Sequence, residues 1–157
     1  MFGQVEQILA ETDGVTPVHG RFYLLCSDFY RIAGRHADFY RASLRFLGCT
    51  DLETLSADER RGRAFALGVA ALLGEGVYNL GELLAHPVLE SLQGQDEQWL
   101  VELLFVMNSG DIAGFHRLKS RWAGQPDLVA KEKFILQKIT LLALMEVHDP
   151  KIHDQSN

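Results

Sequence analysis

The 157-residue chain contains few cysteines, no block of basic residues and no long apolar run. Its two cysteines, Cys26 and Cys49, form no CxxC pair and are too few for a disulfide framework, so we expect free thiols in a reducing compartment. The net charge of -6 argues against binding to nucleic acid or to an anionic membrane, because both need a basic surface. No stretch approaches the roughly 20 apolar residues that span a bilayer. The N-terminus also carries acids where a secretory signal would carry basic residues.

The sequence offers little that could support catalysis. None of its six histidines has metal-ligand spacing, and His148 and His153 lie in a polar terminus that cannot preorganise ligands. Either cysteine could be a hydrolase nucleophile, but apolar helical surroundings are more typical of a core thiol. Glu75 and Glu82 could form a carboxylate pair, although the glycines beside Glu75 leave their geometry unset. The sequence therefore predicts no catalytic residue, no metal site, no cofactor and no small-molecule substrate.

Hydrophobic residues make up 47% of the chain, enough to bury a core. Apolar residues recur with helical period throughout, and no stretch alternates as a strand does, which predicts an all-α fold. Helices are predicted over residues 2–11, 18–33, 36–47, 57–73, 80–85, 87–93, 96–107, 111–122 and 128–147.

Local signals mark several helix ends. Ser56 and Glu59 have the spacing of a capping box, in which each side chain binds the backbone N–H of the other residue. Gly48 follows a helical segment as a predicted C-cap, and Asn79 is a candidate N-cap. Gly68 falls in the middle of a helix, where glycine costs about 1 kcal/mol relative to alanine, so we expect it to permit a close helix crossing.

Residues 63–92 are rich in Ala, Leu and Gly and are typical of short helices that pack against one another. Helices pair at roughly 30 to 40 residues per unit along the chain, as they do in helical-repeat solenoids. Residues 29–47 look like a degenerate tetratricopeptide unit. The pattern favours a helical-repeat domain over residues 1–147 rather than a closed bundle, followed by a disordered polar tail at 148–157.

Short sequence pieces spread over residues 15–146 resemble the PCI-domain subunits of the proteasome regulatory lid. They include Phe46-Leu47-Gly48-Cys49, His86-Pro87-Val88-Leu89-Glu90-Ser91-Leu92, Gln98-Trp99-Leu100, Gln125-Pro126-Asp127-Leu128 and Leu141-Leu142-Ala143-Leu144-Met145-Glu146. The resemblance implies a right-handed array of antiparallel helix pairs without catalytic residues. It also implies a structural role in lid assembly and ubiquitin-dependent protein degradation, with other lid subunits as partners in cytoplasm and nucleus.

The family continues into a winged helix and a C-terminal helix, which this sequence lacks, so we expect a truncated form whose last helix exposes apolar side chains. The candidate interaction surface consists of Tyr78, Glu82, His86, Leu141, Leu142 and Leu144. The alternative function is a free helical-repeat adaptor of another PCI complex, such as the signalosome or a translation initiation factor.

Overall fold

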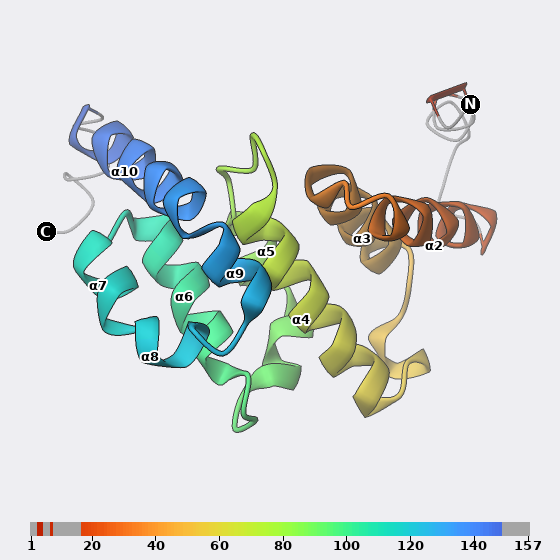
Figure 1. Cartoon of the computed structure of the whole chain (residues 1–157). Helices are drawn as coiled ribbons and strands as arrows, with labels where there is room; N and C mark the ends of the chain where they lie inside the picture. The colour runs from red at the N-terminus through yellow and green to blue at the C-terminus, as the bar shows by residue number, and fades with distance from the viewer. Residues whose placement is uncertain (1–2, 5–6, 8–16, 149–157) are drawn as a thin grey trace, which may run out of the picture.

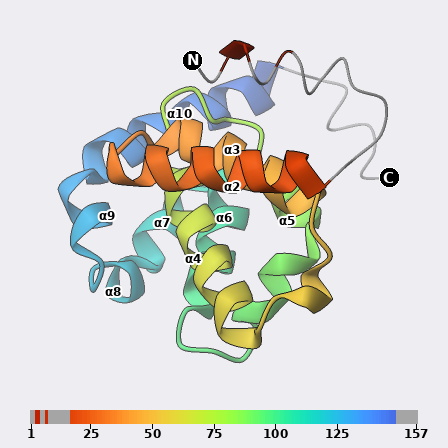
Figure 2. The ribbon, with the colours of Figure 1, turned by 90° about the vertical axis from the view of Figure 1, so that its right-hand side faces the viewer.

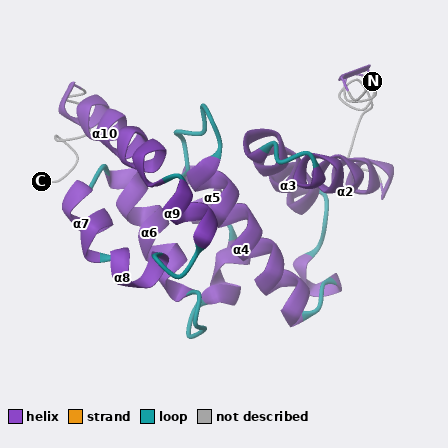
Figure 3. Cartoon of the chain, viewed as in Figure 1, coloured by secondary structure: helices purple, strands orange, loops and turns teal. Residues whose placement is uncertain are grey.

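The computed structural model describes residues 3–4, 7 and 17–148, and within these residues the chain is helical and contains no strand (Figures 1 and 3). The prediction of an all-α helical array is therefore confirmed. The helix predicted over residues 2–11 lies outside the described residues except at 3–4 and 7, and the predicted tail lies outside them beyond His148. The elements are α2 (Pro17–Ile32), α3 (His36–Gly48), η1 (Leu52–Thr54), α4 (Ala57–Leu73), α5 (Gly81–Ala85), η2 (Pro87–Leu92), α6 (Gln98–Ser109), α7 (Ile112–Arg117), α8 (Lys119–Trp122), α9 (Pro126–Ala130) and α10 (Glu132–His148).

The first pair, α2 and α3, forms a hairpin at one end of the array, and α2 lies outermost (Figures 1 and 2). Its turn depends on Gly34, whose φ of 71° lies in the left-handed region that glycine adopts without steric cost. The prediction that Gly48 caps α3 is wrong. The helix includes Gly48 and ends at Cys49, whose N–H donates to the carbonyl oxygens of Arg45 and Phe46. No left-handed residue is therefore needed at this end.

The central element is α4, which contacts α3, η2, α6 and α10 (Figure 1). Its start has the predicted capping box, with Glu59 N–H donating to Ser56 Oγ at 3.2 Å and Ser56 N–H donating to a Glu59 carboxylate oxygen at 3.3 Å. Gly68 permits the predicted close crossing, because a Cβ there would lie 2.6 Å from a methyl group of Leu100 on α6. The core then follows the array from α3 to α10 and includes Leu44, Leu47, Leu67, Leu72, Leu103, Phe115, Trp122, Leu128 and Ile139.

Two predicted helices are each broken in two. The helix through Trp122 divides at Leu118 because the Trp122 indole N–H folds back and donates to the Phe115 carbonyl at 3.0 Å. The rings of Phe115 and Trp122 stack with their centroids 4.9 Å apart, so burial of this aromatic pair compensates for the break in the helix. The last predicted helix divides at Lys131, whose φ of -115° lies outside the helical range, so α9 and α10 are separate.

Candidate interaction surfaces

The residues predicted as an interaction surface fall into two groups. Tyr78, Glu82 and His86 belong to the segment between α4 and η2, and Leu141, Leu142 and Leu144 belong to α10. The two groups meet at one residue that the sequence analysis did not single out, the buried Lys138 of α10.

In the first group, Tyr78 and Glu82 are exposed, whereas His86 is half-buried and has a structural contact. The His86 Nδ1 accepts the Val88 N–H at 3.1 Å and so caps the start of η2. Burial lowers the pKa of His86, and the nearby Glu82 carboxylate partly opposes that shift. Burial, with a further contribution from the same carboxylate, raises the pKa of Tyr40 to about 12. Glu82 thus places a negative charge near both Tyr40 and His86, at the surface of the array.

Lys138 connects α10 to the C-terminal end of α4. Its side chain is buried, and its ammonium donates to the carbonyl oxygens of Ala71 at 2.7 Å, Leu72 at 3.3 Å and Gly74 at 2.7 Å. The last carbonyls of a helix have no partner within the helix and carry partial negative charge, which a cation there satisfies. Burial lowers the pKa of Lys138 to about 8, so the ammonium form still predominates at neutral pH.

The rings of Tyr78 and Phe134 flank the Lys138 ammonium, with centroids 5.9 and 5.8 Å from Nζ. Tyr78 is therefore part of the surroundings of this contact. One sequence signal could have revealed the lysine, because Lys138 falls in register with the apolar Ile135, Ile139 and Leu142 at helical spacing.

The second group lies on α10, at the edge of the molecule away from α2 (Figure 1). Leu141 is 48% exposed and Leu144 is 52% exposed, as expected for an apolar surface patch, whereas Leu142 points inward and packs on the core. Met145, which is 53% exposed, extends the patch and was missed, although it lies one helical turn from Leu141. The α10 patch therefore consists of Leu141, Leu144 and Met145.

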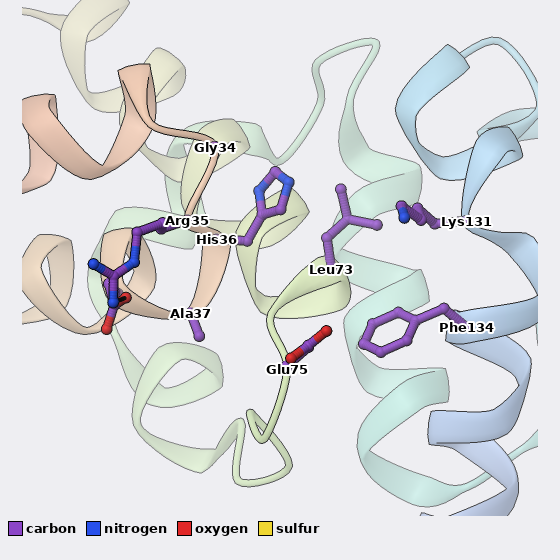
Figure 4. Close-up of a pocket in the computed structure, with 9 residues that line it drawn as sticks. Gly34, Arg35, His36, Ala37, Leu73, Glu75, Lys131 and Phe134 are labelled. Carbon is purple, nitrogen blue, oxygen red and sulfur yellow. Dashed lines mark ion pairs between the residues drawn. The ribbon is translucent and has the colours of Figure 1, made fainter.

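A cleft of about 490 Å³ separates the first helix pair from α10. Figure 4 shows its lining, with Arg35 and His36 from the start of α3, Leu73 and Glu75 from the end of α4, and Lys131 and Phe134 from the start of α10. Arg35 pairs with Asp38 on the next turn at 2.6 Å. The rim thus carries both signs of charge around apolar side chains, which is typical of a polypeptide contact.

The described residues give little support to chemistry at these surfaces. Burial raises the pKa of the thiols of Cys26 and Cys49, so both are poor nucleophiles at neutral pH. Within residues 17–148 both thiols are free, and the described part of the chain groups no three His, Cys, Asp or Glu side chains as a metal site would. No helix among the described residues has the length and apolar character to cross a membrane.

Residues 1–104 match the family model of the PSD13 N-terminal repeats. The chain belongs to this family. The matched residues of this chain contain the α2–α3 pair, α4 with its capped start and Gly68, and the first half of α6.

Relatives over most of the chain carry matching names. The chain is 39% identical over 140 residues to the 26S proteasome non-ATPase regulatory subunit 13 homolog A of Arabidopsis thaliana, covering 87% of this chain and 36% of the relative. It is 34% identical to the 26S proteasome non-ATPase regulatory subunit 13 of Dictyostelium discoideum, covering 90% and 38% of the two chains. It is 32% identical to the 26S proteasome regulatory subunit RPN9 of Saccharomyces cerevisiae, covering 93% and 38%. The chain thus spans little more than a third of the length of these relatives.

Proposed function

We propose that this chain is a non-enzymatic structural segment of the proteasome regulatory lid, acting in assembly and ubiquitin-dependent degradation through contacts with other lid subunits in cytoplasm and nucleus. The observation that carries the proposal is family membership over residues 1–104, together with relatives named as proteasome regulatory subunits. The same names favour the proteasome over the alternative, a free adaptor of the signalosome or of a translation initiation factor.

The geometry supports a role through contacts rather than through reaction. An array of helix pairs presents an elongated surface on which several partners can lie side by side. The α10 patch leaves Leu141, Leu144 and Met145 exposed along one helix, and such patches mark protein contacts more often than isolated apolar residues do. The raised pKa of both thiols is consistent with a non-enzymatic role.

The test is a mild pull-down of the tagged chain from cells, with the recovered proteins quantified by mass spectrometry. We expect lid subunits to be enriched over subunits of the signalosome and of translation initiation factors. Enrichment of either of the latter instead would refute the proposal.

A double variant, Leu141→Glu with Leu144→Glu, tests the α10 patch. We expect it to reduce recovery of lid subunits by at least about tenfold, since two buried leucines at an interface contribute several kcal/mol. Val129→Glu is the matched control, because Val129 is a similarly exposed apolar residue that lies outside the patch, on α9. Equal loss in both variants would mean that the patch has no specific role.

A further inference from the structure

The outermost helix, α2, exposes a row of apolar side chains along its length. Val18 is 63% exposed, Leu25 is 62% exposed and Ile32 is 89% exposed. These residues follow one another at a spacing of seven, so they lie on one face of the helix, and we call them the α2 stripe. The ring of Phe29, which is 48% exposed, lies beside them. Single exposed apolar residues are common on protein surfaces, whereas an aligned row indicates a contact surface.

The opposite face of α2 belongs to the fold. Cys26 is 4% exposed and Ser27 is 1% exposed, and they lie on the side of α2 that packs against α3. Figure 2 looks onto α2 where it crosses the near side of the molecule, with the array behind it. The α2 stripe therefore faces away from the array, and the α10 patch lies at the other end of the molecule (Figure 1).

Two side chains of opposite charge flank the α2 stripe. Arg21 and Asp28 are both exposed, and because they are seven residues apart they project from the same side of α2. Neither forms an ion pair within residues 17–148, whereas Arg35 and Arg41 both pair with Asp38 on α3. An apolar row at a spacing of seven with charges beside it is typical of a helix that pairs with another helix.

The α2 stripe is symmetric about its centre. Val18 and Ile32 lie seven residues before and after Leu25, so two copies of α2 crossing antiparallel at Leu25 would set Val18 against the partner's Ile32. Arg21 lies four residues before the centre and Asp28 three residues after it, so each Arg21 would meet the partner's Asp28. A parallel pair would instead set each charge against its like. The order of the side chains thus makes the α2 stripe complementary to itself under a two-fold axis.

We propose that α2 is a dimerisation helix. The α2 stripes of two copies of this chain pack antiparallel around a two-fold axis at Leu25, and Arg21 forms an ion pair with the partner's Asp28 on both halves of the interface. A helix of 16 residues is about 24 Å long, so the interface is small and we expect a dissociation constant of about 10–100 μM. The proposal uses only residues of α2, so it does not depend on the proteasome assignment.

Sedimentation velocity over about 5 to 500 μM protein measures the dimer. All proteins carry Leu141→Glu and Leu144→Glu, so that contacts through the α10 patch do not contribute. Leu25→Glu brings two carboxylates together at the centre of the interface and should weaken dimerisation at least about tenfold. Phe105→Glu is the matched control, because Phe105 is 54% exposed and lies on α6, and it should change the dissociation constant by less than about threefold. Circular dichroism checks that both variants melt at the temperature of their parent.

Charge reversal tests the antiparallel order. Arg21→Glu alone or Asp28→Arg alone sets like charges against each other twice per dimer, and should weaken dimerisation by about threefold to tenfold at about 20 mM salt. In an equimolar mixture of the two variants, the heterodimer has an ion pair at both positions. The mixture should therefore recover the affinity of the unmodified α2 to within about twofold.

Three outcomes would overturn the proposal. The first is a chain with unmodified α2 that stays monomeric up to about 500 μM. The second is an equal effect of Leu25→Glu and Phe105→Glu on the dissociation constant. The third is a mixture of the two charge-reversed variants that dimerises no better than either variant alone, which would mean that the copies meet in another orientation or through another surface.

Discussion

Lys138 should be among the most sensitive positions of the fold, and Lys138→Met tests this directly. Methionine keeps the unbranched apolar stem but removes the ammonium that binds three carbonyl oxygens at the end of α4. The two bonds of 2.7 Å are charge-assisted and together contribute about 3–6 kcal/mol. Against this stands the cost of burying the ammonium, about 3 kcal/mol for a pKa lowered from 10.5 to about 8. The difference between these two terms predicts a net loss of up to about 3 kcal/mol in the free energy of unfolding.

The assay is urea denaturation at pH 7 followed by circular dichroism at 222 nm. Lys133→Met is the matched control, since Lys133 is an exposed lysine on the same helix and makes no side-chain hydrogen bond or ion pair within the described residues. We expect this control to stay within about 0.5 kcal/mol of the parent chain. If the two variants were equally stable, the view of Lys138 as the link between α10 and α4 would be refuted.

The pH dependence of the Lys138 contribution has a definite sign. The folded-state pKa of about 8 lies below the unfolded value of 10.5, so between these values the unfolded chain binds more protons than the folded chain. Deprotonation of Lys138 in the folded chain removes the cost of burying its charge. This pH-dependent gain in the free energy of unfolding is fully present above pH 10.5 and is lost as the pH falls through about 8. The stability difference between the parent chain and Lys138→Met should therefore grow from pH 8 to pH 10. The titration of the other groups affects both proteins equally and cancels in that difference. A difference that stays constant from pH 8 to pH 10 would contradict the lowered pKa of Lys138.

Three further predictions concern a turn, a cap and the α10 patch. Gly110→Ala should lower the free energy of unfolding, measured by urea denaturation, by more than about 2 kcal/mol, because φ is 67° and the new Cβ would lie 2.7 Å from the α10 backbone. Gly94→Ala is the control, with φ of 73° and open space around it, and should lower it by only about 1 kcal/mol. Stability measured by thermal unfolding should fall as the pH drops below 6.5, because burial lowers the folded-state pKa of His86 and protonated His86 cannot accept the Val88 N–H that caps η2. His86→Ala should lower the free energy of unfolding by about 1 kcal/mol at pH 7.5 and should make stability less dependent on pH. The parent chain should form assemblies larger than a dimer in light scattering at high concentration and the Leu141→Glu, Leu144→Glu variant should not; a parent chain that forms no such assemblies would count against an adhesive patch.

The features that the sequence predicted correctly are those with local causes. Helical period and the Ser56 capping box each depend on residues within a few positions of one another, so they can be predicted without knowledge of the fold. The predictions failed where a distant contact decided the outcome. The helix through Trp122 breaks because an indole binds a carbonyl seven residues earlier, and burial of the stacked rings compensates for the break.

The interaction surfaces divide in the same way. Exposure of Leu141 and Leu144 follows from the periodicity of one helix, so it could be predicted, although which leucine turns inward depends on where α10 sits. The hollow of about 220 Å³ that Ser43 and Arg63 help to line could not be predicted, because these residues lie on different helices and only the crossing of α3 and α4 brings them together. Unpaired polar atoms are a property of the assembled fold, whereas Ser43 alone resembles any other helical serine.

The two ends of α4 are held in different ways, and this difference connects the core to the surfaces. The N-terminal end is capped by its own residues, whereas the C-terminal carbonyls depend on Lys138, more than 60 residues further along the chain. The position of α10 is thus fixed against the end of α4. The cleft in Figure 4 has Leu73 and Glu75 on one side and Lys131 and Phe134 on the other, so the same contact sets its width. Loss of the Lys138 ammonium should therefore alter both the cleft and the orientation of the α10 patch. The hollow lined by Ser43 and Arg63 forms near the locally capped end of α4, so it should be preserved.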